Sequence, residues 1–451
     1  MRCESVILAA GQGTRMRSSL PKVLHPLLGR PMLAWAVAAC REATGRAALV
    51  VVGAQAGPIR DAFADHAEFV VQAEPLGTGH ALLQASQALK GRAELILVMS
   101  ADMPLLRVET LRSLIELQAA TGGPLTLLSH AGETSRGFGR VVRSASGRIE
   151  RVVEEAHATP AERAILEYNA SVYCFRGDWL WIHLAELPIS PKGEYYLTDL
   201  VEAAARQGGE VAGLQVDDSD ELIGVNTLAH LAEAEAAMRR RVNQKWMLAG
   251  VSMADPATTY IGPEVEIGPD TTLLPNTHLW GTTVVGRHST IGPNAIVRDS
   301  RVGDHCRIVA SVVEGSVVEQ GSDVGPFSHL RPGAHLMQGV HVGNFGEVKN
   351  TTLGPGTKMG HFSYLGDATI GEGVNIGAGT ITCNFGRDGT KHRTEIGDEA
   401  FIGSDSLLVA PVRVGKGATT GAGSVVTKDV PDESLAVGMP ARVIRKLKGR
   451  A

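Results

Sequence analysis

Aromatic side chains are scarce in this chain of 451 residues, since Phe, Trp and Tyr together make up only 4% of it. Cysteine is also rare, and the few present show neither the C-x-x-C spacing of a zinc site nor a disulfide framework. They are Cys3, Cys40, Cys174, Cys306 and Cys383. These absences exclude a disulfide-stapled scaffold and a cysteine zinc centre.

Excess positive charge and long apolar runs are missing too. The formal net charge is -5, which gives no basic footprint for nucleic acid. No segment approaches the roughly 20 apolar residues of a membrane span, and the N-terminus enters a short apolar run without a long leader. We therefore expect a cytoplasmic enzyme with small-molecule substrates, no nucleic-acid partner and no integral membrane contact.

The second half carries an Ile-Gly or Val-Gly pair at multiples of about six residues. The pairs begin at Ile261, Ile267, Val285, Ile291, Val324, Val342, Ile370, Ile376, Ile396, Ile402 and Val414. This period fits neither an α-helix nor a simple strand, but fits a chain that turns a corner every six residues. Three such sides make one triangular coil. Residues 251–451 are therefore predicted to form a left-handed parallel β-helix of the hexapeptide-repeat type, a fold frequent among acyltransferases.

The first half lacks this period and alternates apolar runs with helical patterns. The runs at 6–9, 48–52 and 95–99 are typical of buried parallel strands, and the spacing at 31–42 and 79–89 is helical. Residues 1–226 are therefore predicted to form a Rossmann-like α/β domain.

Residues 227–249 contain no Pro or Gly and precede Gly250, a candidate helix cap. They predict a linker helix over 227–250 that joins the two domains. Arg239, Arg240 and Arg241 are interpreted as part of its solvated face, because acidic residues lie just upstream.

A glycine-rich segment directly follows the first apolar run. It reads Leu-Ala-Ala-Gly-Gln-Gly-Thr-Arg-Met from Leu8, and Pro21-Lys22 follow. Such a turn lets backbone N–H groups approach phosphates, while Arg15 and Lys22 add positive charge. Together these motifs resemble those of the sugar-1-phosphate nucleotidyltransferases.

This resemblance implies a set of nucleotide contacts in the first half. They are Leu8, Ala9, Ala10, Gly11, Lys22, Gln72, Gly77, Thr78, Ser100, Ala101 and Asp102. It also implies that Arg15 and Lys22 act in catalysis and that Asp102 and Asn226 bind Mg²⁺. Mg²⁺ keeps most of its waters, so two protein oxygens plus a triphosphate suffice to hold it.

The sugar side resembles enzymes that activate N-acetylglucosamine 1-phosphate. The implied contacts are Gly139, Glu154, Asn169 and Asn226, with the motif at 193–199 shaping the pocket. Two positions depart from that family's usual pattern: Ala101 replaces a glycine, and Ala170-Ser171 replaces Thr-Gly.

The β-helix half carries a second group of polar residues. Arg331 and Lys349 are one coil of eighteen residues apart, so they are predicted to stack about 4.8 Å apart on one face. Two cations on one wall suit a phosphate group. Glu347 and His361 lie close by in the sequence.

Taken together, the motifs of both halves resemble the bifunctional bacterial glucosamine-1-phosphate acetyltransferases and N-acetylglucosamine-1-phosphate uridyltransferases. The resemblance makes His361 the general base, oriented by Glu347, and gives the sugar-phosphate contacts to Arg331, Lys349, Tyr364 and Asn375. The acetyl-CoA contacts it implies are Ala378, Asn384, Phe385, Ser404, Ala422 and Arg442. The family also implies a homotrimer with acetyl-CoA between subunits. The segment 383–391 looks one residue longer than the family pattern.

The implied function is acetylation of glucosamine 1-phosphate followed by uridylyl transfer from UTP, which supplies a precursor of peptidoglycan and lipopolysaccharide. Two alternatives stay open: a single-activity nucleotidyltransferase with a regulatory β-helix, and a non-catalytic scaffold. Within the acetyltransferase, a thiol mechanism through Cys383 is the rival of direct attack assisted by His361.

Overall fold

The computed structural model describes residues 1–447. They divide into two compact units, one ending at Met238 and the other beginning at Arg239. The boundary lies inside the long helix α9 (Leu228–Leu248), so the segment expected to be a linker shares its residues between the units. In the first unit, the α9 residue Glu235 accepts a hydrogen bond from the backbone N–H of Leu28. In the second, Asn243 donates to the carbonyls of Pro256 and Thr259.

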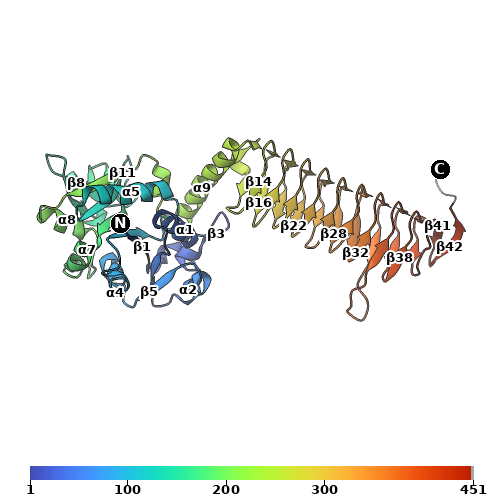
Figure 1. Ribbon diagram of the computed structural model, residues 1–451, viewed down its shortest axis with the longest axis horizontal. Coiled ribbons are helices and arrows are strands. Elements are labelled where there is room, and N and C mark those ends of the chain that lie inside the picture. Colours follow the sequence, from blue (N-terminus) through green and yellow to red (C-terminus); the bar gives the residue numbers. More distant parts are fainter. Residues whose placement is uncertain (448–451) are drawn as a thin grey trace. The chain divides into compact units, whose positions relative to one another are not determined.

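The first unit is built on one mixed sheet, in which β1, β4, β5 and β6 are mutually parallel (Figure 1). The strand order is β11 (Val211–Gln215), β7 (Leu125–Ala131), β10 (Glu167–Arg176), β6 (Leu95–Ser100), β1 (Cys3–Ala9), β4 (Leu49–Gly53) and β5 (Glu68–Gln72). The hairpin of β8 (Arg140–Arg143) and β9 (Ile149–Val153) joins this sheet through β10, and β2 (Pro26–Leu27) and β3 (Arg30–Pro31) form a separate two-stranded sheet. The apolar runs that predicted strands are the buried centre of this sheet.

Helices cover both faces of the sheet. They are α1 (Met32–Thr44), α2 (Gly57–Phe63), α3 (Thr78–Leu83), α4 (Ser86–Leu89), α5 (Val108–Thr121), α6 (Pro160–Arg163), α7 (Gly177–Leu184) and α8 (Asp199–Arg206). One apolar core includes residues of α1, α2 and α5, and the other includes residues of α3, α4, α7 and α8. None of the helices in residues 1–447 combines the length and apolarity that a membrane span requires.

The second unit is a three-sided parallel β-helix (Figure 1), as the six-residue period predicts. Face one runs from β12 (Ser252–Met253) to β39 (Thr419–Thr420) and ends with β41 (Ser434–Gly438) and β42 (Ala441–Lys446). Face two runs from β13 (Tyr260–Ile261) to β40 (Val425–Val426), and face three from β14 (Glu266–Ile267) to β38 (Val412–Val414). Most of the short strands point one aliphatic side chain inward, and these side chains form one continuous core. Strands β34 (Ile381–Cys383) and β39 instead bury Thr382 and Thr420.

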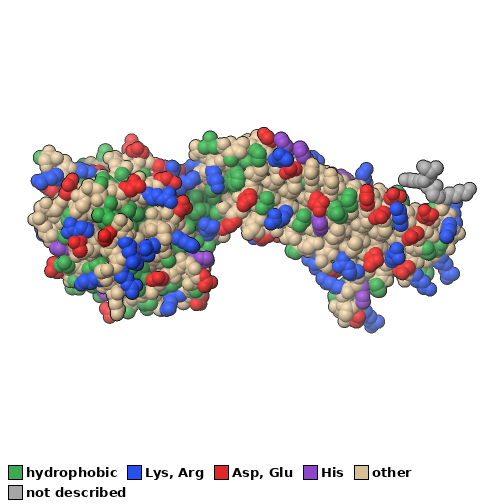
Figure 2. Space-filling model, viewed as in Figure 1, with side chains coloured by type: hydrophobic (Ala, Val, Ile, Leu, Met, Phe, Trp, Pro, Cys, Tyr) green, Lys and Arg blue, Asp and Glu red, His purple; other side chains and the backbone are tan. Residues whose placement is uncertain are grey.

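Coil length varies along the β-helix, which corrects the constant eighteen assumed from the sequence. His329 pairs with Glu347, and Glu347 pairs with Tyr364, so the second of these coils is one residue shorter. Thr352 pairs with Thr369, but Thr369 pairs with Glu395, because residues 384–393 leave the coil as a loop. Figure 2 shows this loop projecting from the β-helix with Lys or Arg and His side chains on it.

Candidate active sites

The loops after β1 and β6 bring the predicted polar residues of the first unit together. The Lys22 ammonium lies 2.5 Å from Asp102 Oδ2 and 2.8 Å from Asn226 Oδ1. The Arg15 guanidinium also donates to Asn226 Oδ1, at 2.8 Å. Asp102 and the segment before Asn226 are joined by the hydrogen bond from Val225 N–H to the Asp102 carbonyl, 2.9 Å long. Four residues from three distant segments therefore meet at one point.

Backbone geometry explains why the loop before Lys22 contains glycine. Gly13 has φ +62°, and a Cβ placed there would lie 2.7 Å from Lys22 Cβ. A larger residue would therefore be strained and would push Lys22 away from Asp102. This glycine holds the lysine in place by leaving room for it.

The oxygens at this point suit a magnesium ion. Asp102 supplies a carboxylate oxygen and Asn226 an amide oxygen, and both converge on one cation, the Lys22 ammonium. Hard oxygen donors of this kind are those that Mg²⁺ prefers. Residues 1–447 contain no cluster of three or more His, Cys, Asp or Glu side chains arranged for a metal, so a metal here would complete its shell with water or substrate.

A cavity of about 590 Å³ lies beside this cluster at the carboxyl end of β1. Open parallel sheets bind ligands at such ends. Of the residues expected to bind nucleotide, five line the cavity: Ala9, Ala10, Gly11, Lys22 and Gln72. The other six lie outside its lining: Leu8, Gly77, Thr78, Ser100, Ala101 and Asp102.

The loop that carries Gly77 and Thr78 is tied to the cavity and to the 193–199 motif. The Gln72 amide donates to the Gly77 carbonyl at 3.1 Å, and the Thr78 hydroxyl accepts from Leu197 N–H at 3.1 Å. Gly77 has φ +99°, and an added Cβ would lie 2.6 Å from the Tyr195 carbonyl oxygen. The motif expected to shape the sugar pocket therefore packs directly on the loop expected to read the base.

The predicted sugar contacts also lie near one another. Asn169 N–H donates to the Gly139 carbonyl at 2.8 Å, and Glu154 accepts from the Thr198 hydroxyl at 3.1 Å. The side-chain amide of Asn169 is buried and donates to the Tyr173 hydroxyl at 2.6 Å. That bond holds the amide group in a fixed orientation.

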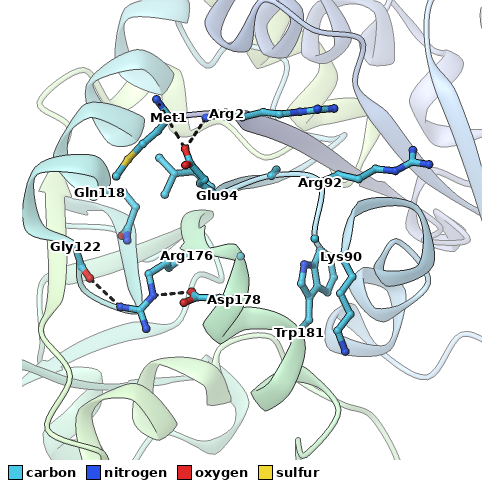
Figure 3. Close-up of a pocket in the computed structure, with 14 residues that line it drawn as sticks. Met1, Arg2, Lys90, Arg92, Glu94, Gln118, Gly122, Arg176, Asp178 and Trp181 are labelled. Carbon is cyan, nitrogen blue, oxygen red and sulfur yellow. Dashed lines mark hydrogen bonds and ion pairs between the residues drawn. The ribbon is translucent and has the colours of Figure 1, made fainter.

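A larger cavity, of about 900 Å³, lies at the amino ends of β1 and β6 (Figure 3). Several of its charged groups have partners within the cavity: Arg176 donates to Asp178, and Glu94 accepts from the backbone N–H of Arg2. Its walls contain none of the predicted site residues. This cavity is therefore separate from the nucleotide cavity at the opposite strand ends.

In the second unit, Arg331 and Lys349 lie side by side at the corner between faces two and three. Arg331 N–H donates to the Val348 carbonyl at 2.8 Å, which continues the pairing of β25 (His329–Leu330) with β28 (Gly346–Lys349). The Arg331 guanidinium donates to Glu347 Oε1 at 2.7 Å. Glu347 therefore orients Arg331, whereas the sequence led us to expect that it orients His361. The His361 side chain forms no hydrogen bond within residues 1–447.

Lys391 is a residue that the sequence reasoning missed. It lies in the 384–393 loop, and its side chain comes within hydrogen-bonding reach of Lys349. This contact, followed by the charges of Lys391 and Arg331, lowers the pKa of the Lys349 ammonium. Three cations thus gather at this corner. The only sequence signal was a lysine in the segment that departs from the family pattern, with nothing to show where the loop would fold.

His361 is exposed at the corner between faces one and two, next to a column of predicted acetyl-CoA contacts. Phe362 accepts from Gly379 N–H, Ala378 from Asp405 N–H, and Ser404 from Gly423 N–H. Ala378, Ser404 and Ala422 therefore occupy the same corner on successive coils. The other predicted acetyl-CoA contacts lie elsewhere: Asn384 and Phe385 at the corner between faces two and three, and Arg442 in β42. Asn375, a predicted sugar-phosphate contact, lies on face one.

Cys383 lies at the end of β34 (Ile381–Cys383), and partial burial raises the pKa of its thiol. A nucleophilic cysteine needs its thiolate form, which a raised pKa disfavours. The environment of Cys383 thus opposes a thiol mechanism.

Comparison with known proteins gives matches for both halves. Residues 5–181 match the MobA-like NTP transferase domain, and residues 393–428 match the hexapeptide repeat of succinyl-transferase. A solved structure of UDP-glucose pyrophosphorylase complexed with UDP-glucose aligns with a TM-score of 0.46 and 18% identity, covering 53% of this chain and 100% of that chain.

Full-length relatives are more similar. The Bifunctional protein GlmU of Pelobacter propionicus is 46% identical over 98% of this chain and 97% of its own length. The proteins of that name from Trichlorobacter lovleyi and Lactococcus lactis subsp. lactis are 44% and 43% identical, over 97% and 99% of this chain and 96% and 97% of theirs.

A nucleotidyltransferase domain followed by a hexapeptide β-helix defines a two-domain transferase. Because the identity extends over both domains, the chain belongs to the GlmU family of bifunctional proteins. It is a bifunctional acetyltransferase and uridyltransferase, with nucleotide and acetyl-CoA substrates. This membership decides against the single-activity and scaffold alternatives.

Proposed function

We infer that the protein acetylates glucosamine 1-phosphate with acetyl-CoA and then transfers UMP from UTP to the product. The second reaction yields UDP-N-acetylglucosamine and pyrophosphate. This proposal rests on one observation: a chain similar to the family over its full length contains two polar clusters, one in each unit. The clusters contain Lys22 and Asp102 in the first unit, and Arg331 and Lys349 in the second.

In the uridylyl transfer, a phosphate oxygen of N-acetylglucosamine 1-phosphate attacks the α-phosphorus of UTP, and pyrophosphate leaves. The attacking phosphate is already ionised, so no general base is required. Lys22 and Arg15 neutralise negative charge beside the cavity, while the glycine-rich loop holds the nucleotide in line. Mg²⁺ bound by Asp102 and Asn226 would supply further charge neutralisation on the triphosphate.

In the acetyl transfer, the amine of glucosamine 1-phosphate attacks the thioester carbonyl of acetyl-CoA. A C–N bond forms, the C–S bond breaks, and CoA leaves as the thiol. His361 takes the proton from the attacking amine as general base. Arg331, Lys349 and Lys391 supply positive charge for the sugar phosphate.

We also propose that the protein works as a homotrimer. Phe327, Phe345 and Phe362 lie at the same corner as His361 and are 62%, 58% and 56% exposed. Phe327 and Phe345 stack with ring centroids 5.5 Å apart. Such an exposed apolar column suits contact with another chain. Packing of subunits at this corner would complete acetyl-CoA sites whose predicted contacts are split between two corners of one chain.

Product analysis tests this function directly. The full-length protein is mixed with glucosamine 1-phosphate, acetyl-CoA, UTP and Mg²⁺, and products are separated by chromatography with mass detection. We expect free CoA, pyrophosphate and UDP-N-acetylglucosamine. In a second reaction, N-acetylglucosamine 1-phosphate replaces glucosamine 1-phosphate. Release of pyrophosphate in this reaction, with no release of CoA in the first, would support only the activity of the first unit. Absence of both products would contradict the proposal.

A further inference from the structure

The corner residue Asp367 lies directly below the point where the 384–393 loop leaves the β-helix. Tyr364 of β31 (Ser363–Gly366) pairs with Ile381 of β34, so Asp367 and Asn384 are equivalent positions on successive coils. Ala368, the first residue of β32 (Ala368–Ile370), pairs with Thr394, where the chain returns to the coil. Both ends of the loop thus meet at Asp367.

Asp367 binds both of these ends. Its Oδ2 accepts a hydrogen bond of 2.5 Å from the Asn384 amide, and its backbone carbonyl accepts from Thr394 N–H at 3.2 Å. Its Oδ1 accepts from Asn350 on the coil below, at 2.6 Å. The loop neck closes above it through His392 N–H and the Asn384 carbonyl, 2.8 Å apart. The carboxylate therefore connects the loop base to the underlying coil.

The environment of Asp367 keeps this carboxylate ionised. The residue is only 5% exposed, and burial by itself disfavours the charged form. The hydrogen bonds from Asn350 and Asn384 and the charges of Lys391 and Lys349 nevertheless lower its pKa. Hydrogen bonds to a charged acceptor are stronger than neutral ones, so the hold on Asn384 is firm.

We propose that Asp367 is a positioning residue for acetyl transfer, which fixes the 384–393 loop so that Asn384 and Lys391 meet their substrates. The inference rests on the proposed function, because Asn384 is expected to contact acetyl-CoA and Lys391 the sugar phosphate. Asp367 touches neither substrate in this role. It acts through the two loop residues it holds.

The test compares Asp367→Asn with the unaltered protein in steady-state acetyl transfer. The amide keeps the size of the side chain but replaces one acceptor with a donor, so it cannot accept from both asparagines. We expect the KM for acetyl-CoA to rise about tenfold, with kcat changed much less, from the loss of one charged hydrogen bond. Asp398→Asn is the matched control, because Asp398 is also a corner aspartate, and within residues 1–447 its carboxylate accepts only from the backbone N–H of Glu372. It should leave both constants unchanged.

A double variant separates positioning from general damage. Asn384→Asp alone places two carboxylates in contact and should impair acetyl transfer severely. Combined with Asp367→Asn it restores a donor–acceptor pair, so the double variant should be more active than Asn384→Asp. An unchanged KM in Asp367→Asn, or a fall in kcat alone with a lower melting temperature, would overturn the positioning role. If the unaltered protein itself releases no CoA, the proposed function fails instead.

Discussion

The Lys22 ammonium and the Asp102 carboxylate form an ion pair, 2.5 Å long, at the carboxyl ends of β1 and β6. Their side chains are only 12% and 21% exposed, so solvent screens the pair little. The pair couples the phosphate-binding loop to the residue expected to hold the metal. Asp102 thus holds the Lys22 ammonium beside the cavity where the triphosphate is expected to lie.

Replacing Asp102 with Ala should impair uridylyl transfer selectively. We expect a fall of about 10²–10³-fold, the range seen when one preorganised electrostatic group is lost. Acetyl transfer should stay near normal, because its residues lie in the other unit. Pyrophosphate and CoA release measure the two reactions, EDTA should mimic the substitution, and Asp65→Ala at an exposed site is the control. Equal loss of both activities in folded protein would contradict the assignment.

His361→Ala should lower acetyl transfer by about 10²–10⁴-fold, the contribution of a positioned general base. Uridylyl transfer should be unaffected. His341→Ala is a suitable control, since His341 bonds Asp323 on the preceding coil. Intact-mass spectrometry of the protein with acetyl-CoA alone tests the rival mechanism: an acetyl adduct on Cys383 would show that the thiol, not the substrate amine, attacks first.

Lys391→Ala should change the pH profile of acetyl transfer. Lys391 lowers the pKa of Lys349, so Lys349 loses its charge at lower pH than an isolated lysine would. Removing Lys391 should raise that pKa and shift the alkaline limit of kcat/KM for glucosamine 1-phosphate to higher pH. The KM for this substrate should rise roughly tenfold from the lost charged contact. Arg387→Ala, in the same loop, is the control, and an unshifted alkaline limit would argue against a shared phosphate site.

Phe345→Glu should weaken the proposed trimer. A charge on the exposed phenylalanine column would have to be buried without a partner at a subunit interface, which is unfavourable. Analytical ultracentrifugation should show trimers for the unaltered protein and smaller species for the variant, with acetyl transfer reduced and uridylyl transfer kept. A monomeric unaltered protein with full acetyl transfer would refute the trimer.

Truncation after Ala249 should keep pyrophosphate release from UTP and N-acetylglucosamine 1-phosphate. All residues expected to act in that reaction precede Met238, the end of the first unit. Circular dichroism should confirm that the fragment is folded. A folded but inactive fragment would mean that the β-helix contributes to uridylyl transfer.

Sequence motifs alone indicated both folds, and the physical reason is local periodicity. The inward aliphatic residue and the tight bend recur in every coil, so pairs such as Ile261-Gly262 report the β-helix without any long-range information. The stacking of Arg331 on Lys349 followed from the same repeat. The glycine-rich segment after β1 likewise pointed to phosphate binding, because only its backbone conformation is required.

Only the tertiary structure decided which side chains come into contact across successive coils and between distant loops. The partner of Glu347 is Arg331 because pairing of adjacent coils, not proximity in sequence to His361, places their side chains together. Lys391 reaches Lys349 through a loop that leaves the coil, and no period constrains where such a loop folds. Asp367 showed no signal of its role, since its contacts with Asn350 and Asn384 exist only when three successive coils are stacked.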